Sequence, residues 1–222
     1  MFKKISISGF FFLFLILLAG CGQNQFDNIS AFDESEVIIQ EQVESSQTKE
    51  EITEQLRNAN EGSIEALIAN HFSFVESVAG EKTTSNVYGT DLFEVEELAD
   101  LLAEIKQPNE ISDYIDGQQI LVYPDDFVIL KKSEEIEDMT FIEVANEQFV
   151  RNNYSPNFLT TYLGIRLLES MFGNNWVSNR RNYCQTNDCY GGYSTTRNYN
   201  KGGTSTNRGM NSFRGGGPSS GK

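Results

Sequence analysis

Gln119-Ile120-Leu121-Val122-Tyr123-Pro124-Asp125-Asp126-Phe127-Val128-Ile129-Leu130 is the stretch that decides the fold. It holds two runs of β-forming residues on either side of a Pro-Asp turn, and this pattern predicts a β-hairpin. Thr140-Phe141-Ile142-Glu143-Val144 is apolar enough to form a third strand beside it. Three strands with helical cover suffice for independent stability. We therefore predict an α+β domain, with a small antiparallel sheet and helices packed on it.

Two more strands and three helices are predicted upstream of the hairpin. Residues 74–79 alternate weakly in polarity, and residues 83–88 could pair with them. Helical spacing of apolar residues predicts a polar helix over 50–60, and Ser63 suits the N-cap of a second one. A third helical stripe runs from Phe93 to Ile105, with Thr90 or Asp91 as its cap and Pro108 beyond its end.

A last helix is predicted to begin at Ser155-Pro156, a serine cap followed by proline in the first turn. It continues to Phe172 with few polar positions, which indicates a mostly buried helix, and it ends at Gly173. The same density of apolar residues would also suit a membrane-surface or partner-docking helix. Core packing is the preferred interpretation, because the polar face lacks the lysines of an interfacial helix.

The first 21 residues predict export. Lys3 and Lys4 precede an apolar run from Gly9 to Leu18, and Leu18-Ala19-Gly20-Cys21 follows. This pattern resembles a bacterial lipoprotein signal, which implies that residues 1–20 are removed and that Cys21 is lipidated at the mature N-terminus. The alternative is a plain membrane anchor with an incidental cysteine. The run is shorter than the roughly 20 apolar residues of a spanning helix. We expect a lipid-anchored chain on the extracytoplasmic face of the cell membrane.

Charge is divided unevenly along the mature chain. Residues 21–172 hold 31 acids and 8 bases, a net charge of −23, whereas residues 173–222 hold one acid and seven bases, a net charge of +6. The basic part should be attracted to anionic polymers or headgroups, unless its charge serves only solubility. The expected contact residues are Arg180, Arg181, Arg197, Lys201, Arg208 and Arg214.

Composition also places the domain boundaries. Residues 21–47 are polar and acidic and predict a tether, although Val37-Ile38-Ile39 could add a strand or dock on the domain. Residues 48–172 form the α+β domain. Residues 173–222 contain 10 of the 18 glycines and almost no aliphatic side chains, which predicts a flexible tail. An exported chain meets no cytosolic nucleotide, so no cofactor and no nucleic-acid partner is expected.

Cys184 and Cys189 are the two cysteines left after Cys21. In an exported chain a local disulfide between them is the preferred interpretation, with free thiols or a redox or metal role as alternatives. No metal site is predicted, since a zinc site takes four ligands. His71 alone defines no catalytic site, and Asp125-Asp126 fits a turn better than a calcium site with six to eight oxygen ligands.

The C-terminal third has a distinctive set of motifs. They are Asn153-Tyr154-Ser155-Pro156, Tyr162-Leu163-Gly164, Ser170-Met171-Phe172-Gly173, Trp176, Cys184, Cys189-Tyr190-Gly191-Gly192-Tyr193 and Ser212-Phe213-Arg214-Gly215-Gly216-Gly217-Pro218. With the leader, these motifs resemble a family of small bacterial lipoproteins defined as a domain of unknown function. The resemblance covers nearly the whole chain and implies no activity and no catalytic residues.

The function expected from these observations is not enzymatic. We expect a cell-envelope lipoprotein that acts as an interaction or accessory module, whose basic tail contacts anionic envelope components or a membrane-protein partner. One alternative is an extracytoplasmic receptor for a small cationic ligand such as a polyamine, held by the acidic body. The other is an envelope-modifying enzyme. Convergence of two acids of the body in a pocket is the feature that would distinguish such an enzyme.

Overall fold

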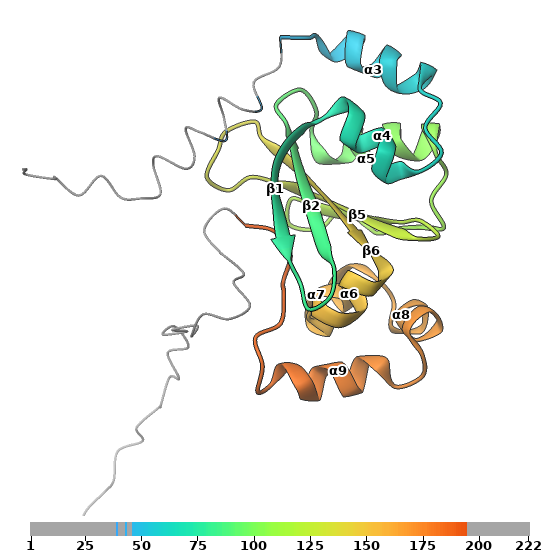
Figure 1. Cartoon of the computed structure of the whole chain (residues 1–222), viewed down its shortest axis with the longest axis vertical. Coiled ribbons are helices and arrows are strands. Elements are labelled where there is room, and N and C mark those ends of the chain that lie inside the picture. Colours follow the sequence, from blue (N-terminus) through green and yellow to red (C-terminus); the bar gives the residue numbers. More distant parts are fainter. Residues whose placement is uncertain (1–38, 40–42, 44–45, 195–222) are drawn as a thin grey trace, which may run out of the picture. The chain divides into compact units, whose positions relative to one another are not determined.

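A six-stranded antiparallel sheet lies at the centre of the described chain, with strand order β1-β2-β6-β5-β4-β3 (Figure 1). The computed structural model describes residues 39, 43 and 46–194, all within the compact unit Ser35–Lys222. The strands are β1 (Ser73–Ala79), β2 (Thr84–Thr90), β3 (Glu110–Ile111), β4 (Gln118–Val122), β5 (Asp126–Lys132) and β6 (Thr140–Asn146). With the helices below, this sheet confirms the predicted α+β class.

The predicted hairpin is strands β4 and β5. They pair with Ile120 opposite Ile129, and the Tyr123 amide donates to the Asp126 carbonyl at 2.8 Å to close the turn. Strand β6 lies between β5 and β2, so the predicted third strand joins the hairpin to the upstream pair. The upstream pair is also confirmed, with a bulge near Phe74 in β1.

Helices cover both faces of the sheet, and the sequence of the central strands reflects this. In β5, Phe127 and Ile129 belong to one apolar cluster, whereas Val128 and Leu130 belong to the other. A strand buried on both faces has a continuous apolar run instead of alternation. Figure 1 shows one group of helices on one side of the sheet and a second group on the other. They are α3 (Lys49–Asn58), α4 (Ile64–His71) and α5 (Val95–Ile105), then α6 (Glu147–Asn153), α7 (Pro156–Tyr162), α8 (Ile165–Phe172) and α9 (Trp176–Cys184).

The first helical layer follows the predictions, except for one cap. Thr48 and Glu51 form a capping box at α3, and the Ser63 side chain accepts a hydrogen bond from the Ala66 amide at α4. The predicted cap of α5 at Thr90 or Asp91 is wrong, because Thr90 Oγ1 accepts instead from the Leu92 amide in a turn before the helix. Helix α5 begins later, after Glu94.

The predicted helix from Ser155 to Phe172 is two helices. Helix α7 ends at Tyr162 and α8 begins at Ile165, because Leu163 turns into the core and Gly164 adopts an extended conformation. The Ser155 side chain makes no capping hydrogen bond, although Pro156 does open the helix. The preceding helix α6 was not predicted. Its cap is Asn146, whose Oδ1 accepts from the Phe149 amide at 2.8 Å.

Ordered packing extends beyond the predicted α+β domain at both ends. The tail does not begin at Gly173, because helix α9 follows and residues up to Tyr193 pack into the core. Tryptophan and tyrosine replace the missing aliphatic residues in this packing. At the other end, Val43 is only 1% exposed and Ile39 packs against the same apolar cluster, so part of the predicted tether docks on the domain.

The leader 1–20, Cys21 and residues 195–222 lie outside the described residues. Within the part that the structure describes, none of the helices is long and apolar enough to cross a membrane.

Candidate functional site

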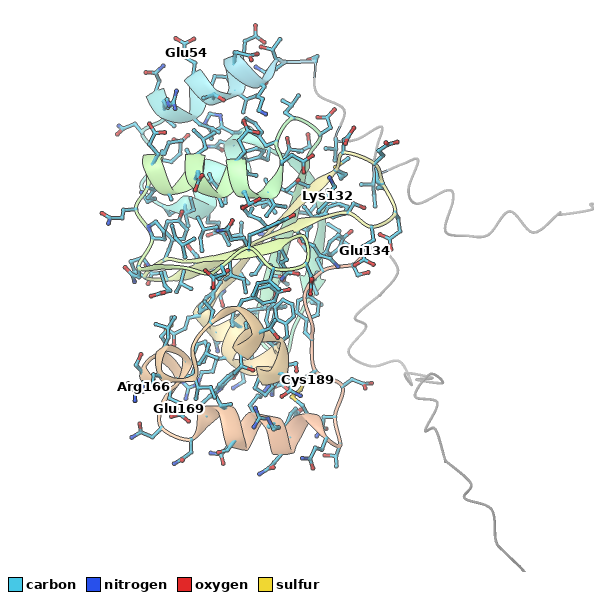
Figure 2. The ribbon with its side chains drawn as sticks, turned by 180° about the vertical axis from the view of Figure 1, so that it is seen from behind. Glu54, Lys132, Glu134, Arg166, Glu169 and Cys189 are labelled. Carbon is cyan, nitrogen blue, oxygen red and sulfur yellow. A yellow bond between two sulfur atoms is a disulfide. The ribbon has the colours of Figure 1, made fainter. Side chains whose placement is uncertain are left out.

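Residues 185–193, here called the C-terminal strap, lead the chain from α9 back to the sheet. A disulfide joins Cys184 to Cys189 and confirms the predicted pairing. Figure 2 shows Cys189 beside α9, on the side of the sheet covered by α6–α9. The closed loop reverses the chain within five residues, so that Tyr190 points back toward the core.

Backbone hydrogen bonds fix the strap to the junction between α6 and α7. The Tyr190 amide donates to the Asn153 carbonyl at 2.8 Å, and the Ser155 amide donates to the Tyr190 carbonyl at 2.7 Å. This is a parallel bridge between Tyr154 and Tyr190. The Asn153 side chain in turn accepts from the Glu81 amide at 2.9 Å, which ties the same junction to the β1–β2 turn.

Glu143 in β6 is the polar anchor of the strap. Its side chain is 1% exposed, and its Oε1 accepts a hydrogen bond from Ser85 Oγ at 2.7 Å. Its Oε2 accepts from the Tyr190 hydroxyl at 3.0 Å and from the Tyr193 amide at 3.2 Å. Burial raises the pKa of the Glu143 carboxyl, and these hydrogen bonds act against that increase. Removal of any one of these hydrogen-bond donors would leave the buried carboxylate partly unsatisfied and would therefore lower the stability of the fold.

Aromatic rings surround this carboxylate. Tyr190 packs edge to face on Tyr154 and Phe149, with ring centroids 4.8 and 5.7 Å away, and Tyr193 packs on Phe141 at 4.9 Å. Burial, and then the charge of Glu143, raise the pKa of the Tyr190 hydroxyl far above its ordinary value, so this group stays a neutral donor. Gly192 has a φ of +90° and passes Phe158 so closely that a Cβ would lie 3.1 Å from the ring.

The sequence analysis did not identify this anchor. The available signal was Glu143 itself, a single acid at an inward-facing position of an otherwise apolar strand. A buried carboxylate requires donors, and the tyrosines of the Cys189-Tyr190-Gly191-Gly192-Tyr193 motif supply them.

A polar pocket of about 300 Å³ lies on the other face of the sheet. Its lining residues are Glu65, Thr83, Thr84, Asn86, Asp126, Val144 and Asn146. Burial, and then the charges of Glu65 and Asp125, raise the pKa of the Asp126 carboxyl to about 6. Asp125 lies in the hairpin turn as predicted, whereas Asp126 is the first residue of β5 and shares the pocket with a second acid, Glu65.

Two of the predicted anion-contacting arginines are described, and they differ. Arg180 Nε donates to the Tyr154 carbonyl at 3.0 Å, and its guanidinium lies 4.7 Å from the Tyr183 ring centroid. These contacts attach the Arg180 side chain to the junction between α6 and α7. Arg181 is exposed and donates to Asn157 Oδ1 at 3.1 Å. The other predicted contacts, Arg197, Lys201, Arg208 and Arg214, lie outside the described residues.

His71 lies at the end of α4, with its Nε2 3.5 Å from Glu61 Oε1. Both side chains are largely covered. Among residues 46–194, no group of three or more His, Cys, Asp or Glu side chains is arranged to hold a metal ion.

The two helical layers differ in charge. Helices α3–α5 carry eight acids and two bases, a net charge of −6, whereas α6–α9 carry two acids and four bases, a net charge of +2. Figure 2 shows Glu54 projecting from the first layer and Arg166 from the second, on opposite sides of the sheet. The strap lies on the side of the sheet that α6–α9 cover.

Comparison with known proteins identifies one family. Residues 55–222 match the family described as Domain of unknown function (DUF4247), and this match covers most of the chain. The chain therefore belongs to that family. No curated protein and no solved structure matches the chain.

Proposed function

We propose that this member of the DUF4247 family is a lipid-anchored accessory module of the bacterial cell envelope, whose basic C-terminal tail contacts anionic envelope components or a protein partner. The anchor rests on the leader, in which Leu18-Ala19-Gly20 precedes Cys21 after a short apolar run. Acyl chains on one cysteine would hold the whole domain at the membrane.

The division of charge is the observation that carries the interaction role. The strap fixes Tyr193 to the sheet on the side of the α6–α9 layer, whose net charge is +2. The following residues 195–222 contain five bases and no acid. The basic residues 195–222 therefore follow directly from a residue that is fixed to the sheet, whereas the α3–α5 layer on the other face is acidic. Such a distribution favours contact with anionic surfaces through one side only.

The anchor is tested by mass spectrometry of the membrane fraction. We expect a mature chain that begins with a diacylglyceryl cysteine at position 21, and we expect a Cys21→Ser variant to lose stable membrane attachment. A mature chain that begins elsewhere, or a variant that stays membrane-bound after removal of the leader, would contradict the proposal.

The interaction is tested with the leaderless Cys21→Ser chain in vesicle sedimentation. We expect binding to vesicles with anionic phosphatidylglycerol and none to neutral vesicles. High salt should abolish it, because the screening length falls from about 8–10 Å near physiological ionic strength to about 3 Å at 1 M. A matched variant changes the four bases Arg197, Lys201, Arg208 and Arg214 to Gln and should not bind. Equal binding by this variant would exclude the tail as the contact. Salt-insensitive binding to the vesicles would contradict an electrostatic contact.

The polar pocket favours a second candidate function, the binding of a small cationic ligand such as a polyamine. Glu65 and Asp126 line the same pocket of about 300 Å³. Because the pKa of Asp126 is about 6, binding of a cation should weaken as the pH falls through 6. Isothermal titration with spermidine should show binding that Asp126→Asn abolishes and that Glu54→Gln, on the exposed face of α3, leaves unchanged. Equal affinity in both variants would contradict this candidate.

A further inference from the structure

The C-terminal strap is held at two places by different chemistry. At its start, the disulfide between Cys184 and Cys189 closes the loop that turns the chain back. At its end, Tyr190 and Tyr193 bind the Glu143 carboxylate and pack on the rings beside it. The first hold is covalent and can be removed by reduction, whereas the second is non-covalent and reversible.

The disulfide lies where a reductant can reach it. Residues 185–188 are exposed, and both cysteines are only partly covered. The aromatic anchor, in contrast, is buried. A thiolate can therefore attack the disulfide without prior unfolding of the sheet, and exchange depends on such access.

We propose that the strap is a redox-gated cover of the sheet, which a dithiol opens by reducing the Cys184–Cys189 bond. One thiolate of the dithiol attacks a cysteine sulfur, the Cys184–Cys189 bond breaks, and a mixed disulfide forms. The second thiol of the dithiol then resolves it. The products are two protein thiols and an oxidised dithiol, so two electrons and two protons pass to the protein.

Reduction changes the opening equilibrium of the strap. The closed loop lowers the entropy of the open strap, and loss of a loop of this size raises the open population about 30-fold. In the open state Tyr190 and Tyr193 leave Glu143, and the carboxylate with its aromatic surround faces solvent. Residues 185–193 are then no longer held on the sheet, so about nine more residues separate the domain from the basic residues 195–222. This gating goes beyond the proposed envelope role and does not depend on the lipid anchor.

Hydrogen exchange of the full chain, with and without dithiothreitol, tests the proposal. We expect native protein to be reduced without denaturant. The Tyr190 amide, which is bonded to the Asn153 carbonyl, should then exchange about 30-fold faster. Amides in the centre of β5, such as Val128, should keep their protection. The double variant Cys184→Ser/Cys189→Ser should reproduce the reduced state without any reductant.

Three results would overturn the proposal. The first is a disulfide that dithiothreitol reduces only in denaturant. The second is equal protection of the Tyr190 amide in oxidised and reduced protein. The third is an equal acceleration at Tyr190 and Val128, because the bond would then stabilise the whole domain and would not gate the strap. The Glu143→Gln variant gives an independent control, because it weakens the anchor while leaving the disulfide intact. Its Tyr190 amide should exchange faster even in oxidised protein.

Discussion

Removal of one hydroxyl should reveal how strongly Glu143 holds the strap. Tyr190→Phe keeps the ring that packs on Tyr154 and Phe149 but removes the donor that lies 3.0 Å from Glu143 Oε2. A hydrogen bond to a charged group contributes about 1.5–3 kcal/mol. We therefore expect the free energy of unfolding to fall by about 2 kcal/mol at pH 8.

The loss should depend on pH in a defined direction. The folded state raises the pKa of Glu143, so its contribution to stability is complete below the unfolded value of 4.5 and is lost as the pH rises through the folded value. The Tyr190 hydroxyl opposes that increase, and its removal raises the pKa further. The destabilisation should therefore be smaller at pH 5, where the carboxyl is more often protonated, than at pH 8.

Urea denaturation at both pH values measures this effect, and Tyr183→Phe is the matched control. The Tyr183 side chain is 41% exposed, and its hydroxyl donates to Glu81 Oε1 at 3.3 Å. We expect the control to change stability by less than about 0.5 kcal/mol. Equal losses in the two variants, or a loss for Tyr190→Phe that is larger at pH 5, would refute the role assigned to Glu143.

Three further predictions concern other parts of the domain. In Gly89→Ala the new Cβ would lie 2.8 Å from Val43 Cγ2, so the variant should lose about 1–3 kcal/mol in urea denaturation. Val43→Ala should relieve part of that loss in a double-mutant cycle, whereas strict additivity would contradict the docking of Val43. Asp126→Asn should raise the free energy of unfolding by about 1 kcal/mol or less at pH 7 and by almost nothing at pH 4. The reason is that the half-buried carboxylate, with a pKa of about 6, destabilises the fold only when it is ionised. An equal gain at both pH values would exclude this cause. Arg180→Ala should destabilise by about 1–2 kcal/mol, whereas the exposed Arg181→Ala should change stability by less than about 0.5 kcal/mol, and the reverse order would refute the structural role of Arg180.

The sequence predicted the elements whose signals are local. The hairpin around Pro124 was recognisable because turn chemistry and β-forming residues agree over twelve positions. The Ser63 cap was recognisable because a serine directly precedes apolar residues at helical spacing. The break at Gly164 was missed because the apolar positions continue through it, and only the inward turn of Leu163 ends the helix.

The strap could not be predicted from local composition. Glycine and polar residues around Cys184 indicate a flexible segment, since little aliphatic surface is available to offset ordering. Its order comes instead from partners far away in the chain: Tyr190 and Glu143 are 47 residues apart. A disulfide and a buried carboxylate take the place of aliphatic core contacts, and neither produces a helical or strand period in the sequence.

The position of β6 also sets the order in which the domain can assemble. Strand β6 inserts between β2 and β5, and its partners Asn86 and Val144 are separated by 58 residues. Closing so long a loop slows folding, because its entropy is lost before the contacts form. During synthesis, the β1–β2 and β4–β5 hairpins can form early. Each lacks its neighbouring strand in the sheet until β6, which ends at Asn146, has been synthesised. The burial of Glu143 then requires Tyr193, so the last step of folding depends on a residue near the end of the described part of the chain.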